Sequence, residues 1–468
     1  MPTSVDFIED SNVSIGYLGI VAGAFDTLEI AGAVDRAIPK TRHHHLTHGD
    51  IVKAMVLNGL GFVERRLYRV SGEYDADFDS RDMTITYGHP KDGQWDLKQF
   101  VLGMATDQHG IPLFLQTFSG NESDKKTLLT IITQLTENLQ HPGKVYHIAD
   151  AAFYTAENLA TLGTHTFWIS RVPATLNEVK DLVAADLPLQ PCADDRYRYA
   201  EHLSEYASIP QKWVVYHSAP MQEQQEKTFA KRLENDWKKV ETSLRKLRAR
   251  AFACEPDARI AAEKWLQEHS QFCFTSMDIQ VITQKKTKKR GRPKAGEPVE
   301  TVYTVSAEIE HDAKSFEEKR QKLGRFVLAT NDRDLSPDEL LANYKDQGTV
   351  ERGFRFLKDP SFRVAEIYLK KPSWIQTLAM IMVLCLFIYA MTKFRLRRKL
   401  QETGETVTGQ TKKQTQNPTL KWLFFRFRGV RELRFQAGEA VTVLVTNMTP
   451  EFWKILRLLG QEYENYYL

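Results

Sequence analysis

The stretch VYHIADAAFYTAENLATLGTHTFWIS, residues 145–170, decides the fold class of this 468-residue chain. Its first residues, Val145–Ala149, are an apolar run that predicts a buried strand. Thr155, with Asn158 three positions on, predicts the N-cap of the helix that follows. Residues 166–170 predict a second strand. A strand, a helix and a strand in this order are typical of an α/β sheet.

Asp150 follows the first of these strands directly. In α/β sheets, ligands bind beyond the carboxyl ends of the strands, so Asp150 is a candidate metal ligand. The competing interpretation is that Asp150 caps the next helix, but Thr155 already fills that position. An aspartate at a strand end is common, so this residue alone does not identify a function.

The sequence on either side extends the pattern. Short β-branched and aromatic runs predict three upstream strands, at residues 83–87, 99–104 and 112–118. A helix follows, with apolar residues on one face, and the pattern resumes at residues 325–330. Together these elements predict an α/β fold with one mixed sheet.

The pattern of apolar residues changes over residues 181–324, which predicts an insertion into the α/β domain. Apolar side chains between Phe229 and Leu247 repeat at 4-4-3-4-3 spacing, which predicts a helix with one apolar stripe. A second helix is predicted from Pro256 to about Glu268, so the insertion contains a helical hairpin. The remaining insertion segments are strand-like, at residues 212–217, 278–283 and 301–309.

Composition excludes several classes of protein. Hydrophobic residues make up 42% of the chain and charged residues 26%, which excludes a disordered or collagen-like chain. The net charge of +3 is too small to indicate a partner. The four cysteines include no C-x-x-C pair, which argues against a disulfide framework or a cysteine zinc site and fits a reducing cytosol.

One apolar run could be mistaken for a membrane span. Residues 378–391 are fourteen uninterrupted apolar residues followed by a basic cluster, whereas a span needs about 20. A buried core helix is therefore predicted, with a membrane span as the alternative. Residues 1–10 lack the basic and apolar regions of a signal peptide.

The chain length favours two to four domains, and the shifts in pattern predict five segments. Residues 1–66 form a helical N-terminal domain with DNA binding as its expected role. Residues 67–180 and 325–400 form the two parts of the α/β domain, and residues 181–324 form the insertion. Residues 401–468 form a C-terminal region, in which residues 425–428 are interpreted as part of a strand.

Two further helices are predicted after the last strand of the α/β domain. The segment Ser336–Glu339 is a capping box with proline at the first helical position. On the second helix, from about Val350 to Asp359, Glu351, Arg355 and Lys358 share one face. An apolar stripe beside them can seat this helix on a sheet. The alternative is a solvated row of ion pairs.

The ordered spacing of Tyr344, Gln347, Glu351 and Lys358 resembles the Y-(2)-R-(3)-E-(6)-K signature of bacterial insertion-sequence transposases of the DDE type, the YREK subgroup above all. Further segments look like that subgroup, and together they extend the resemblance over nearly the whole chain: residues 47–62, 87–92, 96–99, 120–124, 148–154 and 328–332.

The resemblance implies an RNase H-like catalytic domain and cut-and-paste movement of an element bounded by inverted repeats. It also implies two Mg²⁺ ions, or Mn²⁺ in their place, held by Asp, Asp and Glu. Asp150 matches the second Asp and Glu351 the Glu. Tyr344 and Lys358 match the signature's Tyr and Lys and are implied DNA contacts, and Arg355, on the same helix face as Glu351, is a further candidate DNA contact. Gln347 stands where the signature has Arg, so it loses a charge but keeps hydrogen-bonding capacity. The implied partner is double-stranded DNA bound by a homodimer, in the cytoplasm at the nucleoid and away from membranes.

The first Asp of the family pattern is where this chain departs. The family carries it in an apolar strand that precedes the stretch resembling Ser71–Tyr74, but here residues 64–70 join that stretch directly to the N-terminal domain. Asp82, in Asp82-Met83-Thr84, is the candidate replacement, although it opens a predicted strand instead of lying within it. An internally deleted, impaired copy is therefore expected. The alternative is a non-catalytic protein that binds element ends and inhibits intact transposase.

A basic run in the insertion supports a DNA partner. Residues 285–294 hold seven cations and no carboxylate, and such a loop is suited to phosphate binding. Residues 290–293 resemble the core of an AT-hook, with a solvated linker as the alternative interpretation. The candidate DNA-binding side chains of this basic loop are Lys285, Lys286, Lys288, Lys289, Arg290 and Arg292.

Overall fold

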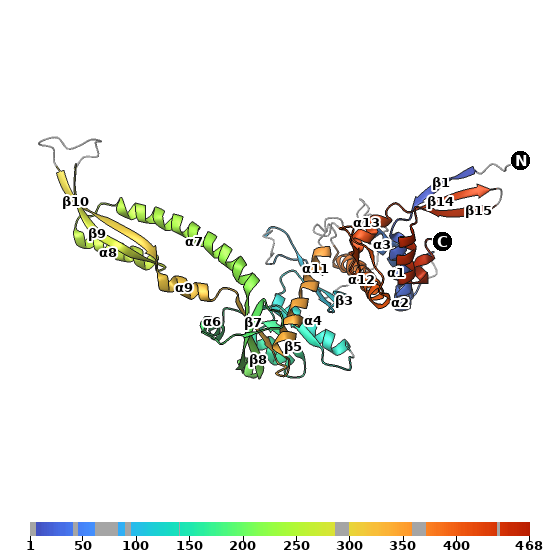
Figure 1. The fold of residues 1–468 in the computed structure, drawn as a ribbon, viewed down its shortest axis with the longest axis horizontal. Coiled ribbons are helices and arrows are strands. Elements are labelled where there is room, and N and C mark those ends of the chain that lie inside the picture. The colour runs from blue at the N-terminus through green and yellow to red at the C-terminus, as the bar shows by residue number, and fades with distance from the viewer. Residues whose placement is uncertain are drawn as a thin grey trace. The chain divides into compact units, whose positions relative to one another are not determined.

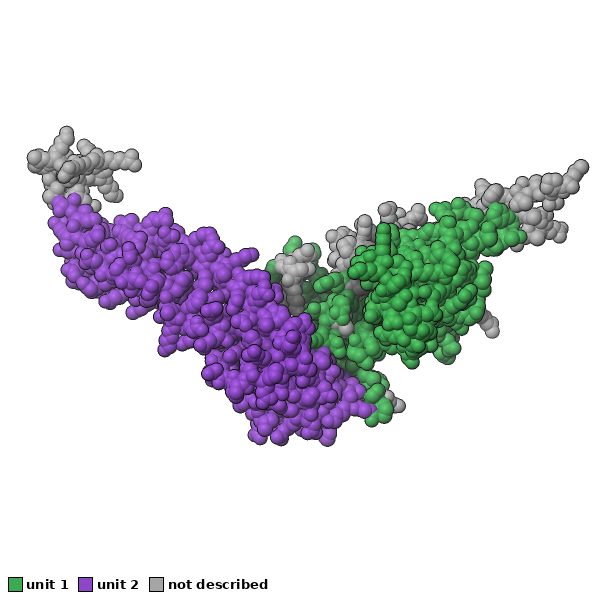
Figure 2. Space-filling model, viewed as in Figure 1, with its two compact units in different colours: residues 1–142, 345–468 green, residues 143–344 purple. Residues whose placement is uncertain are grey.

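The computed structural model describes residues 6–40, 45–60, 83–88, 95–139, 141–285, 299–357, 371–437 and 440–468. The chain is mixed α/β, as predicted. It divides into two compact units, shown in Figure 2: unit 1 comprises residues 1–142 and 345–468, and unit 2 comprises residues 143–344. The domain boundaries given above stay a prediction.

Unit 2 is built on a six-stranded sheet with the order β4-β5-β11-β8-β7-β6. β4 and β5 run parallel, and the other neighbouring strands are antiparallel. The strands predicted at residues 145–149, 166–170, 212–217 and 325–330 are therefore confirmed, although the third pairs with β11 in this sheet. The strands are β4 (Tyr146–Ala149), β5 (Phe167–Arg171), β6 (Gln190–Pro191), β7 (Tyr197–Ser204), β8 (Gln211–Ser218) and β11 (Arg325–Thr330).

Four shorter α-helices of the described residues also begin in unit 2. The predicted capping box is confirmed, because the Glu339 carboxylate accepts hydrogen bonds from the backbone N–H and the hydroxyl of Ser336 at 3.2 and 2.6 Å. The helices are α5 (Ala156–Leu162), α6 (Asn177–Ala184), α9 (Ala313–Gln321) and α10 (Pro337–Asp346), of which α10 ends in unit 1.

The rest of unit 2 is an arm with a core of its own (Figure 1). α7 (Ala219–Arg248) begins directly after β8, capped by Ser218. It packs with α8 (Glu255–Glu268) and with the antiparallel ribbon of β9 (Phe272–Lys285) and β10 (Val299–His311). The predicted helices are confirmed, and the stripe residues Val240, Leu244 and Leu247 are buried.

Unit 1 has a core to which both ends of the chain contribute. The N-terminal segment supplies α1 (Leu18–Thr27), α2 (Ile30–Ala37) and α3 (His48–Leu60). It is not purely helical as predicted, because β1 (Asp6–Ser14) pairs with β14 of the C-terminal region. That region supplies α13 (Leu420–Phe427), β14 (Arg431–Ala437), β15 (Ala440–Thr446), α14 (Pro450–Leu459) and α15 (Gln461–Glu464), and the short pair β12 (Val407–Thr408) and β13 (Gln414–Thr415) precedes it.

The strand predicted at residues 425–428 is wrong, because α13 includes Phe425 to Phe427. Leu420, Leu423, Phe424 and Phe427 are buried. Their spacing of three and four residues places them on one helical face, and burial of that face in the unit 1 core favours the helix.

The apolar run at residues 378–391 lies inside α12 (Pro372–Thr403), which packs in the core of unit 1. Within the described residues, α12 is the one helix long and apolar enough to cross a membrane, with mean hydropathy 2.1 over its most apolar window. That window is 56% buried inside the protein, and Ile381, Cys385 and Ile388 are among its fully buried side chains. A core helix passes the same test of length and composition, so the prediction of a core helix is supported.

The upstream strands of the predicted mixed sheet form a separate ribbon in unit 1. β2 (Phe100–Thr106) pairs with β3 (Pro112–Ser119), and the predicted helix is confirmed as α4 (Asp124–Asn138), which covers this ribbon. Among the described strands, β4 pairs with β5 alone, so the prediction of one continuous sheet is wrong.

The strand predicted at residues 83–87 is also wrong, because this segment makes only a single bridge, between Thr86 and Gln99. Its backbone groups are divided between the two strands of the ribbon: Thr86 exchanges hydrogen bonds with Gln99, and Thr84 accepts one from Gly120. A Cβ added at Gly120 would lie 2.0 Å from the Gln99 carbonyl oxygen and 2.6 Å from that of Thr86. Glycine therefore allows the three segments to approach.

Candidate active site

Asp150 lies at the carboxyl end of β4, as predicted, with an exposed side chain. Its Oδ1 atom accepts a hydrogen bond of 3.0 Å from the backbone N–H of Ala152. Its backbone carbonyl accepts one of 3.0 Å from the hydroxyl of Ser170, which is fully buried on β5. The two bonds hold the start of the turn while leaving the carboxylate open to solvent.

Two aromatic side chains anchor the rest of this turn. Phe153 and Tyr154 are buried, and both rings meet the ring of Trp168 edge-on. The Tyr154 hydroxyl donates to Gln211 Oε1 at 2.6 Å and accepts from Trp213 Nε1 at 2.9 Å. Burial raises the pKa of the Tyr154 hydroxyl, so it stays protonated and keeps its donor role.

The predicted cap of the next helix is confirmed. Thr155 accepts a hydrogen bond from the Asn158 backbone N–H at 3.3 Å. The buried Asn158 side chain donates to the Phe153 carbonyl at 2.9 Å. Thr155, and not Asp150, therefore caps α5. Thr155 and Asn158 stabilise the turn and the start of the helix.

Removing the Tyr154 hydroxyl is expected to destabilise unit 2. Tyr154→Phe keeps the ring but leaves Gln211 and Trp213 each with one hydrogen bond fewer in a buried site. A loss of about 1–3 kcal/mol in the free energy of unfolding is expected, measured by urea denaturation.

Tyr206→Phe is the matched control for this prediction. Tyr206 stacks on Tyr154 with ring centroids 5.3 Å apart, and within the described residues its hydroxyl forms no hydrogen bond. Its removal is expected to leave stability nearly unchanged. Equal losses in both variants would show that ring packing, and not the buried hydroxyl, holds the turn.

Asn331 and Asp332, in a segment that supported the resemblance, lie by the amino ends of β4 and β5, whereas Asp150 lies at the carboxyl end of β4. Asn331 binds across β5, accepting from the Trp168 N–H at 3.1 Å and donating to the Thr166 carbonyl at 2.9 Å. The buried Asp332 accepts from Tyr146 and forms a 2.8 Å ion pair with Lys144. Burial alone would raise the pKa of Asp332, but hydrogen bonds from Lys144 and Tyr146 lower it overall. These two residues stabilise the sheet.

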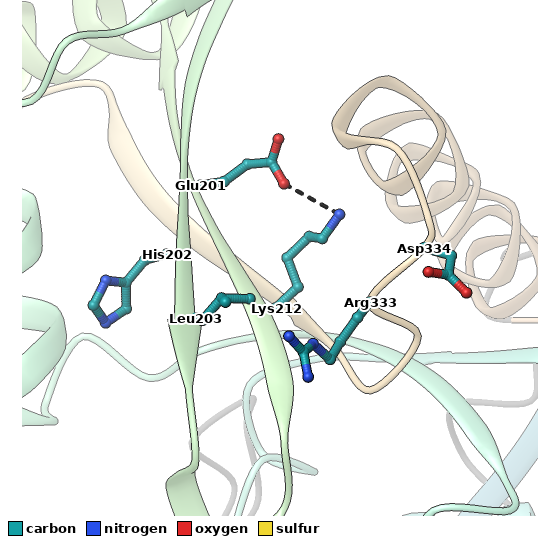
Figure 3. A pocket seen from close by; sticks show the side chains of 6 residues that line it. All are labelled: Glu201, His202, Leu203, Lys212, Arg333 and Asp334. Atoms are coloured by element: carbon teal, nitrogen blue, oxygen red, sulfur yellow. Dashed lines mark ion pairs between the residues drawn. The ribbon is translucent and has the colours of Figure 1, made fainter.

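A pocket of about 620 Å³ lies beside the carboxyl end of β11, on the side of the sheet where Asn331 and Asp332 are found (Figure 3). Lys212, paired with Thr330 in the sheet register, points into it and forms a 3.1 Å ion pair with Glu201. Its ammonium also donates to the Leu335 carbonyl at 3.1 Å. The remaining lining residues are His202, Leu203, Arg333 and Asp334. Since Asp150 lies at the opposite ends of the strands, this pocket is separate from the candidate active site.

Glu351 lies in the first turn of α11 (Gly348–Leu357), in unit 1, and its side chain is exposed. The helix is seated as predicted by Val350, which packs against side chains of β2, β3 and α12. The buried Gly353 faces the same surface, where an added Cβ would lie 3.1 Å from Met104 and 3.2 Å from Leu386. Val350 and Gly353 thus face this surface, while the side chains of Glu351 and Arg355 are exposed.

The other predicted site residues are distributed over both units. Tyr344 packs against the core of unit 2 from α10, and Gln347 joins α10 to α11. Asp82 and Lys358 lie outside the described residues, as do the basic-loop residues Lys286, Lys288, Lys289, Arg290 and Arg292, while Lys285 ends β9. The loop therefore joins the strands of the arm's ribbon.

Asp150 and Glu351 belong to different units, and within the part of the chain that the structure describes no group of three or more His, Cys, Asp or Glu side chains could hold a metal ion. The chemistry of the two donors fits a hard divalent cation, which prefers carboxylate oxygen. Each carboxylate is exposed, and the Ala152 N–H binds only one oxygen of Asp150.

Ser170 was not predicted to support the site. The one sequence feature that could have indicated this role is a serine at the end of a predicted apolar strand. Its role became visible only through the register, in which Ser170 pairs with Ala149 immediately before Asp150.

Comparison with known families identifies the protein class. The family model described as "Transposase DDE domain" matches residues 71–388, and one described as "Domain of unknown function (DUF4277)" matches residues 11–79. No curated protein and no solved structure matches the chain significantly. The chain therefore belongs to the DDE transposases of insertion sequences, a family that acts on DNA and generally uses divalent metal ions.

Proposed function

We propose that this chain is built to move an insertion sequence by cut-and-paste transposition, through metal-dependent hydrolysis and strand transfer. The observation that carries the proposal is the exposed Asp150 carboxylate in a turn pinned by Ser170, Phe153 and Tyr154. Two bound Mg²⁺ ions, or Mn²⁺, would activate the attacking oxygen and stabilise the leaving one. Asp150 and Glu351 are the proposed ligands, with Asp82 as the candidate third.

The remaining residues have proposed roles in holding DNA. Tyr344, Gln347, Arg355 and Lys358 are proposed to position the element end, and the basic loop to bind phosphates of the duplex. The proposed assembly is a homodimer on DNA at the bacterial nucleoid. An RNase H-like catalytic domain, interrupted by the insertion at residues 181–324, is the proposed architecture.

We also propose that this copy is impaired. In an RNase H-like sheet the first strand supplies a metal-binding carboxylate from the centre of the sheet. Residues 83–87 do not form that strand, and among the described strands the edge of β4 away from β5 has no partner. The same observation favours the second candidate function, a non-catalytic protein that binds element ends and inhibits intact transposase.

Excision from a reporter element separates these functions. The DNA flanking the gene supplies the inverted repeats, and the chain is expressed alone or together with a longer sister copy. Binding to the repeats, little or no excision alone and reduced excision by the sister copy are expected. Robust excision by this chain unaided would overturn the impairment, and failure to bind the repeats would overturn the proposed function.

A further inference from the structure

Unit 1 contains a cleft of about 1300 Å³ that the sequence analysis did not predict. It is formed by α11, α12, α13 and the turn between β2 and β3. The described residues that line it include six cations and no carboxylate. These cations are Arg352, Arg355, Lys393, Arg397, Arg398 and Lys421.

The cations deep in the cleft form no ion pair with a carboxylate among the described residues. Lys393 has no hydrogen bond or ion pair within the described residues. Burial first, and then the charges of Arg397 and Arg352, lower the pKa of its ammonium, and the Asp107 carboxylate offsets this shift only in part. Arg397 donates to the Pro418 carbonyl at 2.9 and 3.0 Å, a neutral acceptor, so within the described residues it forms no ion pair either. Arg398, at the rim, pairs with Glu402. Such a cleft favours a polyanion.

Aromatic faces line the same cleft. The Phe425 side chain is 57% exposed and stacks on Trp422, with ring centroids 5.5 Å apart and an interplanar angle of 20°. Trp422 is fixed by its Nε1 atom, which donates to the Thr408 carbonyl at 3.0 Å. Phe394 lies against His109 on another wall, 4.4 Å between centroids. An exposed aromatic ring on a fixed support is a surface on which a flat group can stack.

We propose that this cleft binds a single strand of DNA, with its phosphates against the cations and an unpaired base against Phe425. Grooves that bind single strands combine a positive surface with aromatic side chains in this way. In intact duplex DNA the base faces are covered by stacking, and an acidic peptide without aromatic residues has no flat ring to stack. Neither ligand would therefore use both the cations and the exposed ring of Phe425. The inference rests on the proposed DNA-processing function and adds an unpaired strand as its ligand.

Fluorescence anisotropy with a short labelled oligonucleotide tests the proposal, in EDTA so that no metal chemistry contributes. The probes are single-stranded DNA of mixed sequence, the matching duplex and a poly-glutamate peptide of equal charge. The full-length chain is expected to prefer the single strand. Equal or tighter binding of the duplex, or of poly-glutamate, would overturn the proposal.

Two variants test whether the single strand binds in this cleft. Phe425→Ala is expected to weaken single-strand binding by about 5- to 100-fold while changing duplex binding little, because stacking on one base is removed. Lys393→Gln is expected to flatten the salt dependence by about 0.7 in log–log slope, the value for one phosphate bound on a single strand.

Matched controls lie outside the cleft on the same unit. Trp374→Ala removes an aromatic side chain that is 45% exposed on α12, and Lys399→Gln removes an exposed lysine of the same helix. Both are expected to leave single-strand affinity unchanged. Thermal unfolding tests for misfolding. Removing the charge of Lys393, which is partly buried and forms no ion pair within the described residues, is expected not to lower the melting temperature. Affinity losses in the cleft variants no larger than those in the controls would overturn the proposal.

Binding of the single strand and binding of the inverted repeats distinguish failure of the cleft proposal from failure of the proposed function. If the single strand does not bind but the inverted repeats do, the cleft assignment is wrong and the transposase proposal stands. If neither binds, the proposed function fails as well.

Discussion

Asp150→Asn and Glu351→Gln are each expected to abolish any Mg²⁺- or Mn²⁺-dependent cleavage that the chain shows at element ends. Metal ions contribute several kcal/mol of charge stabilisation to phosphodiester cleavage, so the loss is on the order of 10³-fold or more. Both substitutions keep side-chain size, and both side chains are exposed. Neither is therefore expected to unfold its unit. Duplex affinity in EDTA is expected to stay nearly unchanged, because the basic surfaces remain.

A direct measurement of Mn²⁺ binding, by electron paramagnetic resonance, checks the same assignment even where cleavage is weak. The matched controls are Asp186→Asn in unit 2 and Glu137→Gln in unit 1, each an exposed carboxylate elsewhere on its unit. Weaker Mn²⁺ binding is expected in the site variants alone. Unchanged Mn²⁺ affinity and unchanged cleavage in either site variant would remove that residue from the proposed site.

Neutralising the basic loop is the other change with a large expected effect. Replacing Lys285, Lys286, Lys288, Lys289 and Arg290 with Gln is expected to lower duplex affinity across all sequences. The slope of log affinity against log salt is expected to flatten by at most about 0.9 for each phosphate that the loop no longer neutralises. The basic loop joins β9 to β10 in the arm. The core of the arm is formed by other residues, so the arm is expected to fold normally in this variant.

The arm itself offers a control with the same number of charges. Five lysines of α7 are exposed, three of them in ion pairs with carboxylates of the same helix: Lys227, Lys231, Lys238, Lys239 and Lys246. Replacing these five with Gln is expected to change the salt slope much less. Equal flattening in both variants would mean that general charge attracts DNA, and an unchanged slope in the loop variant would make the loop a spacer.

The predictions that proved correct rest on short-range signals. Thr155 caps α5 and Ser336 with Glu339 forms a capping box because these hydrogen bonds span three residues. The stripe of α7 predicted its buried face for the same reason, since helical periodicity repeats within a few turns. The position of Asp150 at the end of β4 followed from the length of one apolar run.

Strand partners could not be predicted in this way. Residues 83–87 have strand composition, yet their hydrogen bonds go to the open end of the β2–β3 ribbon. Residues 212–217 were assigned to the insertion, yet β8 is central in the six-stranded sheet, next to β11. The amino-acid composition of a strand indicates that the strand is buried or half-buried, but it does not indicate which distant strand pairs with it.

By itself, the sequence determined the family, the fold class and the individual carboxylates that are candidates for catalysis, because motif spacing, caps and periodicity are local properties. Only the tertiary structure decided what surrounds them. Ser170 reaches Asp150 through strand register, and Asn331 clamps a strand 163 residues away in the chain. The cationic cleft of unit 1 brings together residues 108–110, 352–355 and 386–425. Contacts between such distant segments depend on how the whole chain buries its apolar surface, and no short stretch of sequence encodes that outcome.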